Sequence, residues 1–569
     1  MSRDAGAVYT ADFETCDNRA VTDGHPTEVR VWLWAACNIE TKHVDYGRDI
    51  MSFLGYMRDN PGDYWFHNLA FDGTHIIDAL FRIGYTVCFD RRPKPHTFTA
   101  LISDKGKFYH VGICFPDGTK CDIYDSLKKF PMSVAALAKT FGTPETKGSI
   151  DYTSWRGPGY DPTPEELGYI RNDVMITARA MEADYNDGLT RMTIGSDCFH
   201  WYKANVGDAW GKLFPRLNTI QDAQMREAYR GGYCRVDPDY KGVDVRGGIS
   251  VDYNSMYPSM MLLKPFPYGY PVYYQGQYQQ DDDMPLYIQT LTCTFHVKPR
   301  GFPMVQLKNS PWYGEHEYVE ETADAVTLTL SSVDLELFFA NYDVDVWSWD
   351  YGYKFRAMRG MFNDYIKYWA EVKQRSTGGA RLLAKLFLNN LYGKFGTNPN
   401  VTGKYPVLEG DVVELLTGEH DERPPVYVPV AIFATAWARH TLLTAAAANR
   451  DRFLYCDTDS LHLLGTEPPA GIECDPVRLG AWKVEGEFSR ARHLRTKCYI
   501  WDLNGKLSVT CAGMPDNIKQ AMTWDNFQIG YRNYDVIDGR PVIKPGQAKL
   551  QPLMVRGGRT LIDRIYSLR

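Results

Sequence analysis

The sequence predicts a multidomain protein of mixed α/β and α+β class, and three observations support this. The chain has 569 residues, more than one hydrophobic core accommodates, so three or more compact units are expected. Residues 1–190 alternate predicted strands and helices, the pattern of an α/β domain. Around residues 188–197 that pattern loosens, and we place the first domain boundary there.

The elements of this first domain follow from local patterns. Val8 to Phe13 and Tyr64 to Phe66 are apolar enough for strands. At residues 163–166 a threonine cap, a proline in the first turn and two early acids predict the start of a helix. The composition, with 44% hydrophobic and 23% charged residues, is that of a soluble globular protein.

Membrane and secretory classes are not expected. No apolar run approaches the ~20 residues that cross a bilayer. The N-terminus carries Asp4 and lacks the apolar segment of a signal peptide. Twelve cysteines without any C-x-x-C pair argue against structural zinc and a disulfide framework, so a reducing cytoplasm is expected.

The distribution of charge suggests a polyanionic partner. The net charge is −7, but residues 354–394 hold nine basic residues against two acids. The tail after Arg540 holds six basic residues against Asp563 alone. A solvated basic face explains either stretch by itself, whereas both together in an acidic chain favour a bound polyanion.

Three acidic clusters mark the first domain. Asp12 and Glu14 lie two residues apart on a predicted strand, so both point to one face. Asp72 follows a second strand, and Tyr169 and Asp173 share one side of a predicted helix. The first cluster alone is explained by a solvated strand edge, and no cluster is specific by itself. Together the four acids could hold two divalent ions, with Tyr169 orienting a water for phosphodiester hydrolysis.

A second set of acids lies far along the chain. Apolar residues flank YCDTDS, residues 455–460, so Asp457 and Asp459 are expected at the tip of a hairpin. Asp252 ends a short apolar strand and would be the third carboxylate. Two acids this close repel unless a cation lies between them. Taken alone, each acid is also typical of an ordinary turn.

Residues 380–395 are predicted to form one amphipathic helix. On a helical projection Arg381, Lys385, Asn389 and Tyr392 fall within about 80° of one another, opposite the leucines and Phe387. Such a face is usually only solvated. Its mixture of cations, amide and tyrosine also suits a triphosphate with its base and sugar, and Lys373 would approach from a neighbouring helix.

The motifs DYNSMYP, KLFLNNLYG and YCDTDS, in this order, resemble the A, B and C motifs of family B DNA polymerases. Lys497-Cys498-Tyr499, the Tyr229-Arg230-Gly231-Gly232 segment and the three acidic clusters join them. The resemblance is closest to the protein-primed branch, the replicative polymerases of phi-twenty-nine type bacteriophages. Two predicted insertions, 263 to about 355 and 397–428, match that branch by position.

The resemblance implies an N-terminal RNase H-like (DEDD) 3′–5′ exonuclease domain and a right-hand polymerase domain with two insertions. The expected units are the exonuclease 1–190, palm 191–262, first insertion or terminal-protein region 263–356, fingers 357–396, second insertion for strand displacement and processivity 397–428, palm 429–525 and thumb 526–569.

For polymerisation, the resemblance implies two divalent ions, Mg²⁺ or Mn²⁺, at each active site. They would be held by Asp252, Asp459 and the Tyr253 backbone carbonyl, with Asp457 supporting. Lys373, Lys385 and Arg381 would neutralise the triphosphate. Tyr257 would exclude a 2′-hydroxyl, and Asn389 and Tyr392 would complete the nucleotide pocket.

For the exonuclease, the implied metal ligands are Asp12, Glu14, Asp72 and Asp173, with Tyr169 and Lys147 assisting. The implied DNA-binding residues are Thr15, Asn68, Phe71, Ser126, Leu127, Tyr152, Tyr229, Arg230, Gly231, Gly232, Lys497 and Tyr499. The implied partners are primer-template DNA, dNTPs and a terminal protein as primer. The chain would be a monomer or a heterodimer with that protein, in the cytoplasm of an infected bacterium.

The chain departs from the family pattern in two places. Arg381 stands where lysine is expected, and a guanidinium prefers bidentate contacts. The segment between Tyr499 and Cys511 is shorter than in relatives. The alternatives are a family B polymerase primed by nucleic acid, a repair nuclease, and a protein that only binds DNA. Seven acids would repel phosphate in a pure binder, which disfavours the last.

Overall fold

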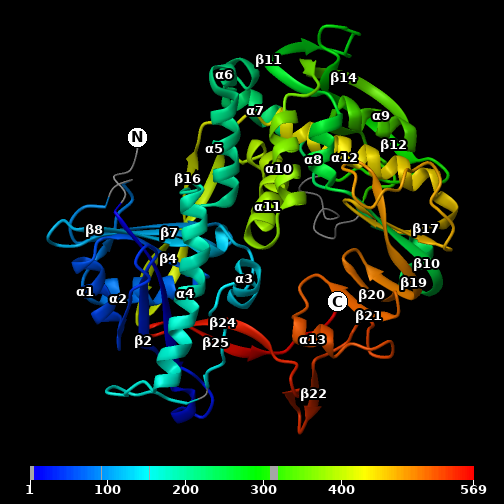
Figure 1. Cartoon of the computed structure of the whole chain (residues 1–569). Helices are drawn as coiled ribbons and strands as arrows, with labels where there is room; N and C mark the ends of the chain where they lie inside the picture. Colours follow the sequence, from blue (N-terminus) through cyan, green and yellow to red (C-terminus); the bar gives the residue numbers. More distant parts are fainter. Residues whose placement is uncertain (1–5, 91–92, 153, 308–317) are drawn as a thin grey trace.

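The structure is a computed structural model that describes residues 6–90, 93–152, 154–307 and 318–569 (Figure 1). Residues 308–317, inside the first predicted insertion, lie outside the described part. Three large sheets and two smaller ones are joined by helices, which confirms the predicted mixed α/β, multidomain organisation. No helix in these ranges has the length and apolarity to span a bilayer.

The N-terminal domain is built on a ten-stranded sheet with the order β16-β15-β6-β7-β8-β4-β1-β2-β3, and β5 pairs with β6. Tyr9 and Phe13 of β1 pack with α1 and α2 on one face. Thr10 faces α4, where its hydroxyl donates to the Val174 carbonyl at 2.8 Å. The bounds are β1 (Ala7–Asp17), β2 (Val29–Asn38), β3 (Val44–Gly47), α1 (Ile50–Asp59), β4 (Gly62–Phe66), α2 (Leu69–Arg82), β5 (Thr86–Val87), β6 (Thr97–Ser103), β7 (Phe108–Cys114), β8 (Lys120–Asp125), α3 (Val134–Phe141) and α4 (Pro164–Asn186).

The predicted helix start at residues 163–166 is confirmed. Thr163 accepts from the Glu166 backbone, and Glu166 accepts in return from the Thr163 backbone, a complete capping box. The helix runs to Asn186 and carries both Tyr169 and Asp173 on its buried side. Because this cap sets the start of α4, it also sets the positions of Tyr169 and Asp173 along the helix.

A seven-stranded central sheet has the order β21-β20-β19-β10-β18-β17-β9. Helices α8 and α12 cover it, and Val251 and Leu461 share a core with Leu442. The predicted hairpin is confirmed, with Asp457 paired to Ser460 across β17 and β18. The bounds are β9 (Cys234–Val236), β10 (Asp244–Tyr253), α8 (Met256–Leu263), α12 (Pro429–Ala448), β17 (Phe453–Asp457), β18 (Ser460–Leu464), β19 (Trp482–Arg495), β20 (Cys498–Leu503) and β21 (Lys506–Cys511).

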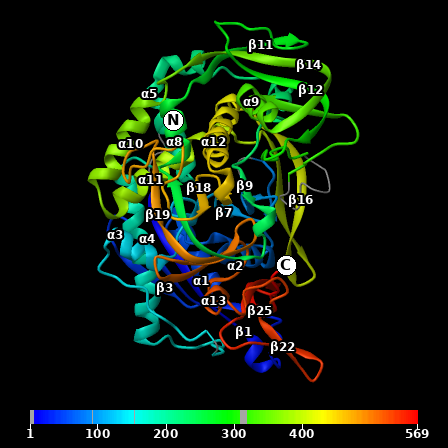
Figure 2. The ribbon, with the colours of Figure 1, turned by 90° about the vertical axis from the view of Figure 1, so that its right-hand side faces the viewer.

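Helices α10 and α11 stand beside the central sheet and pack against α5 and α12 in one core (Figure 2). The amphipathic helix predicted from residue 380 begins two residues earlier, at Gly378, and ends at Phe395. A four-stranded insertion sheet, β11-β14-β12-β13, adjoins this core. The bounds are α5 (Ile194–Val206), α6 (Trp210–Leu213), α7 (Thr219–Arg226), β11 (Phe266–Gln275), β12 (Leu286–Val297), β13 (Val326–Ser331), α9 (Ser332–Asn341), β14 (Tyr342–Met358), α10 (Asn363–Arg375) and α11 (Gly378–Phe395).

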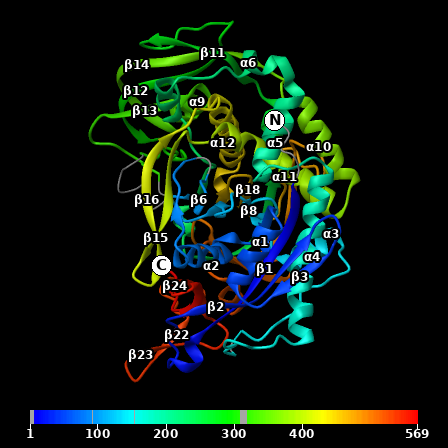
Figure 3. The ribbon, with the colours of Figure 1, turned by 90° about the vertical axis from the view of Figure 1, so that its left-hand side faces the viewer.

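Two hairpins from distant parts of the chain meet on the N-terminal domain. The β15–β16 hairpin follows α11, yet Lys404 of β15 pairs with Ile102 of β6. It runs beside β24 of the C-terminal β24–β25 hairpin (Figure 3). The turn of β24–β25 touches α2, where Nδ1 of His75 lies 2.7 Å from the Gly557 carbonyl oxygen. The bounds are β15 (Asn400–Glu409), β16 (Val412–Glu422), α13 (Asp516–Gln520), β22 (Tyr534–Ile537), β23 (Arg540–Ile543), β24 (Lys549–Val555) and β25 (Gly558–Arg564).

Candidate active sites

The first carboxylate site consists of Asp12, Glu14, Asp72 and Asp173. The alternation along β1 turns the first two toward α4, the same side as Thr10. Asp72 comes from the first turn of α2 and Asp173 from α4. Carboxylate oxygens of Asp12, Glu14 and Asp173 lie within 4.8 Å of one another. Three elements thus bring together acids that are far apart in the sequence.

Negative charge at this site is only partly balanced. Burial, and next the charge of Asp173, raise the pKa of Asp12 to about 7. Burial also raises the pKa of Glu14 and of Asp72, and Asp12 adds to both shifts. Lys147 forms an ion pair with Asp173 through one oxygen, while the other, Oδ1, is buried without a hydrogen-bond partner among the described residues. This donor set fits divalent cations, which carboxylate oxygens bind well.

A cavity of about 520 Å³ surrounds the site. The hydroxyls of Tyr152 and Tyr169 are 2.8 Å apart, and the Lys147 ammonium lies 4.6 Å from the centre of the Tyr169 ring. Ser126 and Leu127 are not in the wall. They lie behind it, where the Asp125 carboxylate accepts from the backbone of Leu127 and of Asn68. The predicted residues in the wall are Asp12, Glu14, Thr15, Asn68, Phe71, Asp72, Lys147, Tyr152, Tyr169 and Asp173.

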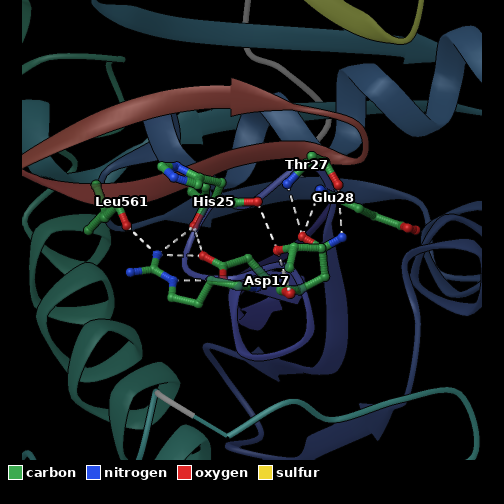
Figure 4. Close-up of polar contacts among 9 residues, drawn as sticks. Asp17, His25, Thr27, Glu28 and Leu561 are labelled. Atoms are coloured by element: carbon green, nitrogen blue, oxygen red, sulfur yellow. Dashed lines mark hydrogen bonds and ion pairs between the residues drawn. The ribbon is translucent and has the colours of Figure 1, made fainter.

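The C-terminal hairpin supplies a wall of this cavity that the sequence did not predict. Leu550, Thr560 and Leu561 line it together with Arg19. Arg19 Nε donates to Asp17 at 2.7 Å, and its guanidinium also donates to the Leu561 carbonyl (Figure 4). The Thr560 hydroxyl donates to the same Asp17 carboxylate. Residues more than 500 positions apart thus close one cavity, and no local pattern signals this.

The raised pKa of Asp12 predicts a pH-dependent stability in the absence of metal. The carboxyl binds its proton up to pH about 7 when folded, against an ordinary value of 3.8. Unfolding therefore releases a proton between these values, so stability falls as pH rises through this window. In EDTA, we expect Asp12→Asn to raise the Tm at pH 8 and to change it little at pH 4.

A thermal melt at both pH values checks this. Replacement of the exposed Asp104 by asparagine is the matched control and should leave the pH dependence as in the parent. An equal Tm change at both pH values for Asp12→Asn would contradict the electrostatic explanation.

The second carboxylate site consists of Asp252, Asp457 and Asp459. Asp252 near the end of β10 pairs with Ser460, next to Asp459. Thr458 adopts a left-handed φ of 56°, and the Asp459 backbone donates to the Asp457 carbonyl at 2.6 Å. This tight turn places the two aspartate side chains in different surroundings. Asp459 lines a cavity of about 870 Å³ together with Asp252, whereas Asp457 does not line it.

Lysines accompany two of these three acids. Lys497 Nζ lies 2.6 and 2.9 Å from the oxygens of Asp457, and Lys483 Nζ lies 3.2 Å from Asp252. Asp459 has no ion pair among the described residues. Burial, followed by the charges of Asp252 and Asp457, raises its pKa to about 6. Of the three acids, Asp459 therefore carries the least balanced negative charge.

The wall opposite these acids is formed by α10 and α11. Lys373, Arg381, Lys385, Asn389 and Tyr392 all line the cavity, as does the Tyr253 residue next to Asp252. The rings of Tyr257 and Tyr392 stack with centroids 4.0 Å apart. Burial, then Arg381 and Lys385, lowers the pKa of Lys373. A group of cations this close together favours the binding of a multiply charged anion.

The predicted DNA-binding segment Tyr229-Arg230-Gly231-Gly232 runs from the end of α11 to the Asp457–Asp459 turn. A Cβ on Gly232 would come within 2.4 Å of the Thr458 hydroxyl, so the close approach requires glycine. Arg439 donates to the backbone carbonyls of Arg230 and Gly231, at 2.9 and 2.6 Å. A Cβ on Gly396, just after α11, would come within 2.7 Å of the Tyr229 hydroxyl.

Tyr499 lies beneath the turn, packed against Tyr455 and His493. It does not line the cavity itself.

Lys139, Thr140 and Lys483 are among the residues that line the second cavity without having been predicted from the sequence. Lys139 and Thr140 come from α3 of the N-terminal domain, against which Gly378 packs. Lys483 comes from β19 and is the register partner of Asp252. The alternation of residues along a strand predicts which face of β19 carries Lys483. That Asp252 lies opposite it becomes clear only from the pairing of β10 with β19.

Comparisons with known proteins agree on one family. A family described as DNA polymerase type B, organellar and viral, matches residues 153–474. The DNA polymerase of Bacillus phage phi29 is 39% identical, and that of Bacillus phage Nf 38%, each over 99% of both chains. A structure of phi29 DNA polymerase with primer-template DNA and incoming nucleotide matches with a TM-score of 0.92 at 38% identity, covering 99% of this chain and 100% of that one.

Proposed function

Because this chain belongs to the phi29-type DNA polymerases of phages, we propose that it works as a proofreading, protein-primed replicase with two separate metal-dependent sites. That it is a DNA-directed DNA polymerase follows from the family. The assignment of two metal-dependent sites depends on one observation: each of two cavities is lined by carboxylates from more than one element, one in the N-terminal domain and one at the central sheet.

At the second site we assign nucleotidyl transfer. Asp252 and Asp459 would hold divalent ions, Mg²⁺ or Mn²⁺, with the Tyr253 carbonyl as a further ligand. Such ions supply Lewis-acid activation of the primer hydroxyl and neutralise the pyrophosphate leaving group. Lys373, Arg381 and Lys385 would bind the triphosphate, and Asn389 and Tyr392 the nucleoside.

Asp457 would act through Lys497, whose ammonium it holds at 2.6 Å. That contact would keep the lysine beside the primer end. Tyr499, Tyr229 and the Arg230-Gly231-Gly232 backbone would complete the duplex-binding surface.

At the first site we assign 3′–5′ hydrolysis. Asp12, Glu14, Asp72 and Asp173 would hold the ions, and Tyr169 would orient the attacking water. Lys147 would counter the charge of the cleaved phosphate from its position beside Asp173. Thr15, Asn68, Phe71 and Tyr152 would bind the single-stranded end, supported from behind by Ser126 and Leu127.

The other parts of the proposal concern replication as a whole. A terminal protein would supply the priming hydroxyl and dock on the insertion sheet, and the β15–β16 hairpin would separate strands ahead of the enzyme. The division into exonuclease 1–190, palm, fingers, thumb 526–569 and two insertions is proposed on the same basis. The place of action would be the cytoplasm of the infected bacterium.

The test is a 5′-labelled primer on a longer template, incubated with Mg²⁺. The proposal expects lengthening when dNTPs are present and stepwise shortening from the 3′ end when they are absent. Extension without shortening would remove the proofreading assignment. Shortening without extension would make the chain a nuclease.

Sugar selection gives a sharper prediction at the second site. The Tyr257 ring is held by its stack on Tyr392 and would occupy the space of a 2′-hydroxyl. We expect Tyr257→Val to raise ribonucleotide incorporation relative to deoxynucleotide by at least about tenfold in kcat/KM, a change of about 1.4 kcal/mol. Tyr392→Phe, which keeps the stacked ring, is the control. An unchanged ratio would assign Tyr257 to packing alone.

A further inference from the structure

Lys483 is placed directly against a proposed metal ligand. It is the register partner of Asp252 across β10 and β19, so the two side chains leave the same face of the sheet. Its Nζ lies 3.2 Å from Asp252 Oδ2 and 3.5 Å from Glu485 Oε1. Glu485 lies at a register shift of β19, between the pairs Val251–Val484 and Ser250–Gly486. The ammonium thus has two carboxylate partners within reach of one flexible side chain.

Lys483 differs from the other cations of the cavity. Lys139, Lys373, Arg381 and Lys385 also line it, and they come from helices on the opposite wall. Among the described residues, Lys483 is the one cation lining this cavity that forms an ion pair with one of its carboxylates. Its side chain is 35% exposed, so it can change partner without opening the core.

A lysine at this position conflicts with a divalent ion at the same carboxylate. An ammonium this close to Asp252 repels a second cation, and the repulsion is relieved only if the lysine moves or gains an anion. Glu485 offers one alternative partner. The phosphates of an incoming nucleotide offer a stronger one, because the cavity that they would enter already includes Lys483.

We propose that Lys483 is an exchangeable counter-ion of Asp252, which balances this carboxylate in the metal-free enzyme and transfers to the triphosphate when metal and nucleotide bind. This inference rests on the proposed metal-binding role of Asp252 and Asp459. Its consequence is that metal alone binds weakly, whereas metal together with nucleotide binds well. Lys483 is thereby a positioning residue that couples the two ligands.

The coupling gives opposite effects on the two ligands when the charge is removed. Lys483→Ala should bind Mn²⁺ more tightly without nucleotide, by about three- to tenfold, because the competing cation is gone. It should bind dNTP more weakly at saturating Mn²⁺, by a similar factor, because the triphosphate loses one partner. Lys483→Arg keeps the charge and should stay close to the parent for both. A residue that only supports the fold would not shift the two affinities in opposite directions.

The experiment uses the full chain with Asp12→Ala and Asp72→Ala, so that Mn²⁺ binding at the second site dominates. Free Mn²⁺ is measured by electron paramagnetic resonance without nucleotide. Retention of labelled dNTP is then measured on a complex with a dideoxy-terminated primer, where no chemistry occurs. Thermal melts show that each variant is folded.

The outcomes separate this inference from the function on which it rests. If Asp252→Asn with Asp459→Asn fails to remove Mn²⁺ binding in this background, the proposed metal site is wrong. If that binding is removed but folded Lys483→Ala binds Mn²⁺ no more tightly than its parent, only the counter-ion inference is overturned. Tighter Mn²⁺ with weaker dNTP establishes it.

Discussion

Replacing Asp252 and Asp459 together by asparagine is expected to abolish primer extension, by at least about a thousandfold, while 3′–5′ degradation continues. These two acids line one cavity, and their carboxylates are the ligands that would hold the divalent ions there. Asparagine keeps the shape and removes carboxyls whose pKa burial has raised, so the fold should not be weakened. Extension of a labelled primer under single-turnover conditions measures the loss.

The converse pair completes this prediction. Asp12→Ala with Asp72→Ala should remove 3′–5′ degradation and leave extension largely intact, since these acids come from β1 and α2 of the N-terminal domain. Circular dichroism and DNA binding serve as controls for folding. If either folded, DNA-binding double variant lost both activities, the two sites would not be independent.

Deleting residues 398–427 and joining the ends with a short glycine linker should abolish synthesis through a downstream duplex. The β15–β16 hairpin begins next to α11 and reaches the N-terminal sheet, where it also runs beside β24. Leu408, Leu415 and Met554 pack on the same core, so the two hairpins and the N-terminal domain form a continuous structure. A single strand passing such a structure would be separated from its complement and held topologically, independently of salt-sensitive phosphate contacts.

Extension on open single-stranded template should survive this deletion, and products of one binding event should become shorter. The deletion also uncovers part of the N-terminal core, because Val413 of β16 is 1% exposed. Degradation of single-stranded DNA by the deletion variant therefore has to be measured as well, to show that the N-terminal domain is still folded.

A point variant tests the same idea with the chain length kept. Val413→Ser should loosen the hairpin from the N-terminal sheet and reduce strand displacement. Leu416→Ser on the same strand, where the side chain is 39% exposed, is the matched control and should behave as the parent. Equal strand displacement by the deletion variant and the parent would leave the hairpin without this role and weaken the protein-primed assignment.

Local periodicity in the sequence predicted which residues of each candidate site share one face of a strand or helix. The period of two along a strand put Asp12 and Glu14 on one face, and the period of 3.6 put Arg381, Lys385, Asn389 and Tyr392 on one side of α11. The capping pattern at Thr163 located the start of α4. In each case neighbours in sequence decide the geometry, so no knowledge of the fold is needed.

Non-local pairing is what the sequence could not supply. Lys483 meets Asp252 only because β19 pairs with β10, more than 200 residues earlier. The β15–β16 hairpin joins a sheet that belongs to the N-terminal domain, although its position in the chain predicts a link from fingers to palm. Leu561 reaches the first cavity for the same reason, through the turn of β24–β25 against His75. Register and docking between distant segments leave no periodic signal.

Anomalous X-ray diffraction from crystals of the full chain, grown with primer-template DNA, a non-hydrolysable dNTP and Mn²⁺, would locate the metal ions directly. Two independent metal-dependent sites predict anomalous peaks between Asp252 and Asp459, and a second group of peaks among Asp12, Glu14, Asp72 and Asp173. A structure with manganese at only one of these places, or bound elsewhere while nucleotide fills the second cavity, would show that the chain does not have two metal-dependent sites.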